Sequence, residues 1–314
     1  MRLVVGCALL ASVIAYVGTG PLIHGILSVD GQAIAAALFL SAVATVAAAW
    51  RWCIIATGLG VPLSWHTAIG RYYQSQFLNT VTPGGIVGDV HRAVAHGQSA
   101  GSVALSARAV VLERTAGQIV QIVLTLIICL FLGAQFGGHL LVVSAIGLGV
   151  VGFGAVTMGL AGAKWPRVGA AIRRELQELR SGIGSVRTAV QVVLASIVVI
   201  SCHVATFAIA TAAIGASVPP GQLLVLTLLV LLGASIPFSI GGWGPREGVA
   251  GWAFAVAGFG ASTGVAASAL FGILTIIAVA PGAVVTLVYA ARRQRPIPQD
   301  TRPVLIAKDL ETTS

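Results

Sequence analysis

Long runs of apolar residues, separated by short polar breaks, dominate the pattern along the chain. Six of these runs are continuous and long enough to cross about 30 Å of hydrocarbon as a helix, at about 1.5 Å per residue. We interpret them as full membrane spans. They cover residues 3–20, 33–57, 115–136, 139–162, 189–215 and 263–290.

Two further stretches are apolar or amphipathic but are interrupted by proline and glycine. Residues 66–112 are broken by TVTPGGIVGD, and residues 222–262 by PFSIGGWGPREG. Proline ends a helix and glycine lets the backbone turn tightly. Each stretch is therefore either a broken, re-entrant hairpin or a pair of separate crossings, at 66–82 and 95–112 and at 222–240 and 246–260. The residues that we expect to shape the tips are Pro83, Gly84, Gly88, Pro237, Gly241, Gly242 and Gly244.

Composition supports the membrane interpretation. Only 9% of the residues are charged, whereas a soluble domain carries about a quarter. We therefore expect an all-α polytopic membrane protein, with one transmembrane domain over residues 1–292 and a disordered tail over 293–314. Residues 3–19 resemble a signal peptide, but further spans follow and no small-residue cleavage site is evident, so we expect an uncleaved anchor.

The positive charges are unevenly distributed between the loops. The net charge is +9, and most Lys and Arg residues lie in 164–187 and in the C-terminal tail, whereas the loops 21–32, 137–138 and 216–221 have none. This asymmetry places both termini on the cytoplasmic side of the cytoplasmic (inner) membrane and accounts for the charge without nucleic-acid binding. Residues 170–187 form a partly apolar segment that we expect to lie on anionic lipid. Trp50 and Trp52 flank Arg51 at a span end, which is typical of an interfacial aromatic belt.

The two halves of the chain share one order of elements. Residues 33–136 read as a span, a broken hairpin and a span, and residues 189–290 repeat this order in the opposite orientation. The tips GGIVGDVHR and GGWGPREG also resemble one another. Inverted repeats with interrupted helices are found in many transporters, where they meet near the membrane midplane.

The first broken hairpin carries most of the polar side chains of its half. On a helix over 66–80, Arg71 and Asn79 share a mostly polar face, which predicts contact with water or protein. Asp89 and Arg92 follow at a spacing of three, one helical turn apart. Arg108, Glu113 and Arg114 form a second charged cluster before the next span.

The second broken hairpin places charges at a predicted helix start. Pro245 suits the first position of a helix, so Arg246 and Glu247 fall in its first turn. Free N–H groups and the dipole favour an anion there, and arginine binds phosphate with two parallel hydrogen bonds. A phosphate grip is one interpretation. The alternative is that Asp89, Arg92, Arg246 and Glu247, whose charges sum to zero, hold the two hairpins together, and both roles can coexist.

No motif in the sequence indicates chemistry at a cofactor. GLGVVG at 147–152 lies inside an unbroken apolar run, without the strand and helix that a dinucleotide site needs. We find no convincing nucleophile, metal cluster or nucleotide site. We therefore expect no catalytic residue, no metal and no cofactor, and transport that is passive or driven by a gradient.

The motifs at the two breaks resemble the transmembrane region of lysylphosphatidylglycerol synthase, also called the flippase-like family. The family has a Phe-Asn-x-x-x-Pro-Gly-x-x-Gly-Asp-x-x-Arg type stretch, an acidic-Arg-x-x-Gly pattern and a Gly-Gly-x-Gly-x-Arg-Glu-Gly stretch. The resemblance covers roughly residues 1–292. The matching residues are Phe77, Asn79, Pro83, Gly84, Gly88, Asp89 and Arg92, then Glu113, Arg114 and Gly117, then Gly241, Gly242, Gly244, Arg246, Glu247 and Gly248.

This resemblance implies lipid translocation. In the bifunctional members the region is regarded as the flippase for aminoacylated phosphatidylglycerol, which a separate soluble domain makes. Here only a short tail follows Arg295, so we expect no aminoacyl transfer. The expected partners are membrane lipids, namely an anionic phospholipid, an aminoacylated lipid or a polyprenyl-phosphate-linked glycolipid, together with a separate lipid-synthesising enzyme.

The hypothesis from the sequence is a lipid flippase for an anionic or phosphate-bearing lipid. Two other classes stay open. One is a non-transporting scaffold that recruits a lipid-modifying enzyme through residues 164–187, and the other is a membrane-embedded enzyme that acts on a lipid head group. The residues expected to contact the head group are Arg71, Asn79, Asp89, Arg92, Arg246 and Glu247.

Overall fold

The computed structural model describes residues 30–82, 85–132, 177, 184–235 and 243–293, and its regular structure in these ranges is α-helical throughout. Within these ranges, four stretches are long and apolar enough to cross a membrane: α3, α6, α9 and the run Ala261–Tyr289. The prediction of an all-α polytopic membrane protein is thereby confirmed. The helices are α3 (Gly31–Gly58), α4 (Trp65–Val81), α5 (Val87–Ala100), α6 (Val103–Leu132), α9 (Val186–Ala213), α10 (Pro220–Ala234), α11 (Pro245–Val256), α12 (Ala261–Ala278) and α13 (Pro281–Arg293).

Polar caps and prolines set where these helices begin. The Asp30 side chain accepts a hydrogen bond from the Ala33 N–H at 2.7 Å, and Ser185 accepts one from the Thr188 N–H at 3.0 Å. Each bond satisfies a donor that has no partner inside its helix, so α3 and α9 start at defined residues. The helices α10, α11 and α13 begin with a proline, which needs no donor at the first position.

Three boundaries differ from the predicted spans. The span predicted at 115–136 begins inside α6, which already starts at Val103. No single helix covers residues 95–112, because α5 ends at Ala100 and Gly101 adopts a left-handed conformation with φ of 77°. The predicted span 263–290 is divided into α12 and α13, since Pro281 begins a new helix after a turn at Val279 and Ala280. The predicted runs 3–20 and 139–162, the segment 164–187 except Gln177 and its last four residues, and the tail lie outside the described residues.

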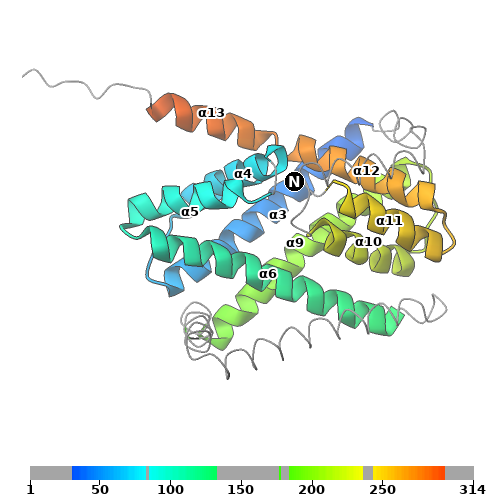
Figure 1. The fold of residues 1–314 in the computed structure, drawn as a ribbon, viewed down its shortest axis with the longest axis horizontal. Helices are drawn as coiled ribbons and strands as arrows, with labels where there is room; N and C mark the ends of the chain where they lie inside the picture. The colour runs from blue at the N-terminus through cyan, green and yellow to red at the C-terminus, as the bar shows by residue number, and fades with distance from the viewer. Residues whose placement is uncertain (1–29, 83–84, 133–176, 178–183, 236–242, 294–314) are drawn as a thin grey trace, which may run out of the picture.

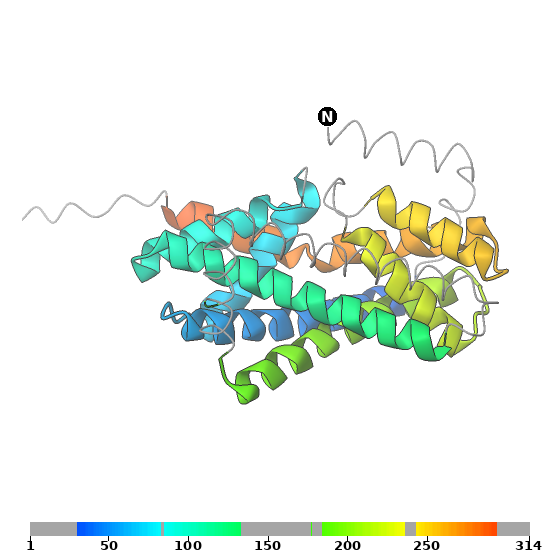
Figure 2. The ribbon, with the colours of Figure 1, turned by 60° about the horizontal axis from the view of Figure 1, so that its bottom comes forward.

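The long helices α3 and α9 pack against each other, and α6 contacts both. Figures 1 and 2 show the shorter helices at opposite ends of the molecule: α4, α5 and α13 gather at one end, and α10 and α11 lie at the other, beside α12. Each end has its own apolar core. One core joins α3, α4, α5 and α6 around Trp52, and the other joins α9, α10, α11 and α12 around Phe207 and Phe254.

The order of the described helices follows the predicted halves. A long helix, two short helices and a longer helix occur in α3–α6 and again in α9–α12. The short helices have 17, 14, 15 and 12 residues. About 20 residues are needed to cross a bilayer, so these lengths suit re-entrant arms better than full crossings. The inverted relation of the two halves stays a prediction.

Candidate functional site

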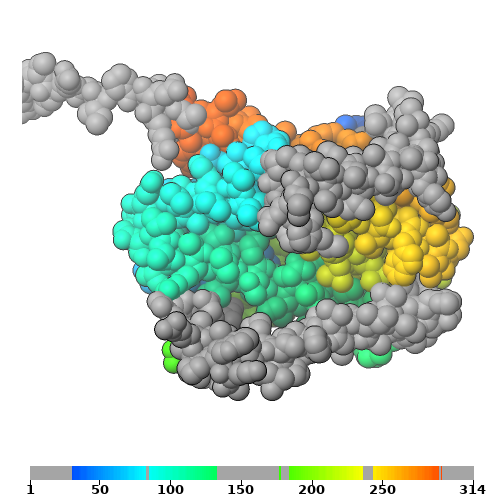
Figure 3. Space-filling model, viewed as in Figure 1, coloured from blue at the N-terminus to red at the C-terminus, as the bar shows by residue number. Residues whose placement is uncertain are grey.

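A cavity of about 300 Å³ lies between the two halves of the molecule. Its wall takes residues from α3, α4, α6, α9, α10, α11 and α12. On the face shown in Figure 3, the residues of α4–α6 (cyan to green) lie beside those of α10–α12 (yellow-green to orange). The charged residues and amides in the wall are Arg51, Arg114, Arg246, Gln76, Gln118 and Gln121.

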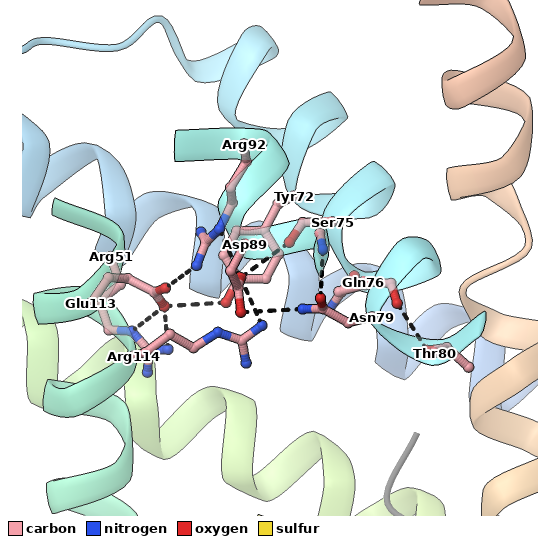
Figure 4. Close-up of polar contacts among 11 residues, drawn as sticks. Arg51, Tyr72, Ser75, Gln76, Asn79, Thr80, Asp89, Arg92, Glu113 and Arg114 are labelled. Carbon is pink, nitrogen blue, oxygen red and sulfur yellow. Dashed lines mark hydrogen bonds and ion pairs between the residues drawn. The ribbon is translucent and has the colours of Figure 1, made fainter. Parts of the chain in front are cut away.

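The carboxylate of Glu113 joins four helices next to this cavity. Arg51 donates from Nε and Nη2 to Oε1, at 3.0 and 2.5 Å, and Tyr72 donates its hydroxyl to the same oxygen at 3.1 Å. Arg92 donates from Nη2 to Oε2 at 2.6 Å. Glu113 is fully buried. A buried carboxylate is tolerated when it is paired and hydrogen-bonded, and these contacts supply both conditions (Figure 4).

Asp89 is the second carboxylate of the same network, and it lies in the first turn of α5. Its Oδ1 accepts hydrogen bonds from Ser75, Arg92 and Arg114, at 3.0–3.1 Å. Asn79 donates to Oδ2 at 3.2 Å and accepts the Gly88 N–H at 2.7 Å. Figure 4 shows these side chains converging from α4, α5 and α6. The turn between α4 and α5 is therefore held by the same groups that orient the arginines.

The three arginines of this network differ in access. Arg92 is fully buried, with its guanidinium 4.8 Å from the ring centre of Trp52 and 4.5 Å from that of Tyr72. The side chain of Arg114 is 47% exposed. Arg51 and Arg114 line the cavity, whereas Arg92 does not. Arg92 thus lies behind Glu113, and Arg114 is the most exposed of the three arginines.

A separate ion pair, outside this network, lies at the start of α11. Arg246 donates from Nε and Nη2 to Glu247 Oε1, at 3.0 and 2.6 Å, and Nε also contacts the Ser268 hydroxyl at 3.0 Å. Glu247 accepts the Gly244 N–H at 2.7 Å through its other oxygen. The prediction that Pro245 begins a helix with these two charges in its first turn is confirmed. The anion at this helix start is the protein's own Glu247 carboxylate, and Arg246 is the group that lines the cavity.

Each of two cavity arginines lies against a glycine of a neighbouring helix. A Cβ added to Gly117 on α6 would meet the Arg51 guanidinium at 2.7 Å, and one added to Gly272 on α12 would meet that of Arg246. The absence of a side chain at these positions lets each arginine cross its neighbouring helix at close range. The surroundings of Arg51 and Arg246 thus have the same composition. Each buried arginine contacts a glutamate, a glycine and a serine, which is Ser196 for Arg51 and Ser268 for Arg246.

Residues 3–282 match the family described as "Lysylphosphatidylglycerol synthase TM region". The chain belongs to this family. It is a membrane protein of lipid-related function, with several apolar helices. Neither the curated proteins nor the solved structures that were searched contain a match to the chain.

The motif residues of the family fall into two clusters in this chain. Asn79, Asp89 and Arg92 join Glu113 and Arg114, which the sequence had indicated as a separate cluster, in one network. Arg246 and Glu247 pair with each other. Among the described residues no ion pair connects the two clusters, so the four charges do not hold the hairpins together in the predicted way. The cavity lies between them instead.

Other predicted residues lie elsewhere. Arg71 is half-buried on α4, near Tyr289 of α13, and Arg108 is half-buried on α6; neither lines the cavity. Of the tip residues, Gly88 packs against the Ser75 carbonyl of α4 and Gly244 is the N-cap of α11, with φ of 98°. The other tip residues, Pro83, Gly84, Pro237, Gly241 and Gly242, lie outside the described residues.

Sequence reasoning missed the part that Arg51 takes in the site. The pattern placed it in an interfacial aromatic belt, but Arg51 and Trp52 are buried, at 6% and 0% exposure. The interpretation was wrong because α3 continues past this point to Gly58, which places Arg51 inside the helix and against Glu113. The sequence offered one signal for this position: the predicted helix continues past Arg51, so the arginine does not lie at the helix end. Ser196 and Ser268, which contact the two arginines, carried no signal in the sequence.

Proposed function

We propose that this protein moves an anionic, phosphate-bearing lipid between the leaflets of the cytoplasmic membrane. The observation that carries the proposal is the cavity whose wall contains Arg51, Arg114 and Arg246 and is formed in large part by the apolar helices α3, α6, α9 and α12. Charged side chains at membrane depth are costly and mark substrate pathways when they line a water-filled space. Guanidinium groups bind phosphate oxygens in pairs, which suits a lipid phosphate.

The head group and the acyl chains would take different routes. The phosphate would enter the cavity and meet Arg114, which is accessible. It would then meet Arg246, which lines the part of the cavity wall formed by the second half of the chain. The acyl chains would stay in the hydrocarbon, where they need no protein contact. Asp89 and Glu247 neutralise Arg114 and Arg246 when the cavity holds no lipid. A ligand phosphate would therefore compete with carboxylates for arginines that are already oriented.

Such movement involves no chemical step and no cofactor, so the lipid leaves in the form in which it entered. Both termini would lie in the cytoplasm, as the loop charges indicate. A separate enzyme would make the lipid and deliver it from that side. Net movement would follow the lipid gradient or another gradient across the membrane.

The test is leaflet exchange of fluorescent phosphatidylglycerol in proteoliposomes, measured by dithionite quenching of the outer leaflet. Arg114→Gln removes the accessible cation while Asp89 keeps Arg92 as a partner, so the variant should fold. We expect at least tenfold slower exchange. Arg187→Gln, at an exposed arginine at the start of α9 outside the cavity wall, is the matched control and should exchange like the wild type.

Equal exchange by Arg114→Gln and the wild type would remove Arg114 from the pathway. No exchange with phosphatidylglycerol or with a native lipid extract, from protein that is folded, would refute translocation. Mass spectrometry of the recovered lipid checks that it is unchanged.

A further inference from the structure

We infer that the cavity takes a phosphodiester lipid whose head group carries hydroxyl groups but no amino group, and that it rejects aminoacylated and other amine-bearing lipids. The inference rests on the proposed function and names its substrate class. It follows from where the few acidic residues of the chain lie and from what already occupies them.

Carboxylates are scarce along the membrane-embedded part of the chain. Between residues 31 and 163 the sequence has only Asp89 and Glu113, and between 184 and 293 it has only Glu247. The remaining acidic residues are Asp30, two in the basic segment 164–187 and three in the C-terminal tail. An ammonium group at membrane depth therefore has three carboxylates to choose from.

All three are already paired with arginine. Glu113 binds Arg51 and Arg92, and Asp89 binds Arg92 and Arg114. Glu247 binds Arg246. Glu113 and Glu247 are fully buried, and no Asp or Glu of the described residues lines the cavity. A lipid amine would have to displace a guanidinium from Glu113 or Glu247, which leaves a buried cation without a partner. Asp89 is less buried, but it does not line the cavity.

The charge balance of the site favours a single negative charge. The four arginines of the two clusters face three carboxylates, which leaves one positive charge. One phosphodiester neutralises it. A head group with an added ammonium restores the excess positive charge next to arginines and carboxylates that are largely buried, where an unpaired charge is expensive.

The remaining polar wall suits hydroxyl groups. Gln118 and Gln121 of α6 line the cavity, and the Gln121 amide nitrogen is buried with no hydrogen-bond partner among the described residues. An amide offers both donors and an acceptor, as a hydroxyl requires. A buried amide nitrogen without a partner is costly, so a ligand oxygen at this position would gain affinity. Gln76 and Ser196 add further uncharged polar groups to the wall.

The test compares two lipids that differ in the amine. Proteoliposomes would contain fluorescent phosphatidylglycerol or the same lipid esterified with lysine. We expect the wild type to exchange phosphatidylglycerol at least tenfold faster. Gln121→Glu supplies the missing carboxylate in nearly the same shape. It should therefore slow the exchange of phosphatidylglycerol between the leaflets and accelerate the exchange of the lysyl ester. Gln98→Glu, on the exposed face of α5, is the matched control and should keep the wild-type preference.

Binding of the two lipids to purified protein in detergent, measured by native mass spectrometry, separates this inference from the proposed function. If neither lipid is exchanged but phosphatidylglycerol binds at least tenfold more tightly, translocation fails and the selectivity stands. Equal exchange or equal binding of the two lipids would overturn the inference. The proposal that the cavity binds a phosphate-bearing lipid would still stand. If Gln121→Glu does not fold, Gln118→Glu tests the same expectation at the neighbouring position in the wall.

Discussion

At the scale of single residues, the buried arginines Arg51 and Arg246 have the same types of residue in direct contact. Arg51 has Glu113, Ser196 and the bare backbone of Gly117, and Arg246 has Glu247, Ser268 and Gly272. Removing one partner of a buried pair leaves an uncompensated charge, which costs more than the pair contributes. The strongest effects of substitution should therefore come from the partners of the arginines as well as from the arginines.

Gly272→Ala tests the close approach of Arg246 to α12. The added Cβ meets the Arg246 guanidinium and the ring of Trp243, so both must shift. We expect lipid exchange to fall at least tenfold and the folded state to lose about 1–3 kcal/mol, as overpacking usually costs. Thermal unfolding in detergent and proteoliposome exchange measure the two effects. Gly248→Ala is the control, since a Cβ there meets nothing within 4 Å; equal behaviour of the two variants would contradict the packing argument.

Glu113→Gln tests the central carboxylate of the first network. The substitution leaves Arg51 and Arg92 without their shared counter-charge, and we expect a loss of about 3–5 kcal/mol in the free energy of unfolding. Tyr72→Phe removes only one hydrogen bond to the same carboxylate and should cost about 1.5 kcal/mol. Chemical denaturation in detergent measures both. A Glu113→Gln loss no larger than that of Tyr72→Phe would show that the arginines find other partners.

At the scale of elements, the turn between α4 and α5 shows how a broken helix becomes a fixed structure. The two helices approach so closely that a Cβ at Gly88 would collide with the Ser75 carbonyl. Asn79 then holds the start of α5 through the Gly88 N–H and Asp89. The break thus positions Asp89, and through it Arg92 and Arg114.

Asn79→Ala should release this turn. The variant loses the bonds to the Gly88 N–H and to Asp89, and we expect a loss of about 1–2 kcal/mol together with slower lipid exchange. Thr80→Ala changes the next residue, whose hydroxyl bonds only the Gln76 carbonyl of its own helix (Figure 4), and should be nearly neutral. Hydrogen exchange of the α5 amides locates the effect. Unchanged protection of the α5 amides in Asn79→Ala would show that contacts other than those of Asn79 stabilise the turn.

At the scale of the whole molecule, two apolar cores flank the long helices and the cavity lies between them. One core belongs to α3–α6, and the other is built from α9–α12 together with Ala37 of α3 and Cys129 of α6. The three cavity arginines come from α3 and α6 in the first half and from α11 in the second. A movement of one half against the other would change the distance between Arg114 and Arg246 and the access to the cavity between them, as when the repeats of a transporter rock against each other.

The predicted orientation is tested at the two ends of α9. This helix of 28 residues is about 42 Å long, so residues beyond its ends lie on opposite sides of a bilayer. In a background without the four native cysteines, Gly184→Cys and Ser217→Cys place exposed thiols there. A membrane-impermeant maleimide added to intact cells should label Ser217→Cys alone, and both after lysis. Labelling of Gly184→Cys in intact cells would show that the protein has the opposite orientation in the membrane.

Much of the element order followed from apolar runs and breaks, because a helix in a bilayer must satisfy its backbone internally and be apolar over its length. The long helices α3 and α9 matched the predicted runs, and Pro245 marked the start of α11. The boundary at Gly101 was missed, since a single glycine in a helical pattern is often tolerated. The break before Pro281 was missed because the apolar run continues past this proline to Ala290.

The sequence by itself determined the class of protein, the membrane environment and the family, since each depends on residue types and their spacing along one chain. It also determined that charges gather at the two breaks. Only the tertiary structure decided which charges meet. Arg51 and Glu113 are 62 positions apart, and Arg51 and Ser196 are 145 apart, so no local pattern connects them. The packing of α3 against α6 and α9 decides that Arg51 and Arg114 face the cavity while Arg92 lies behind Glu113.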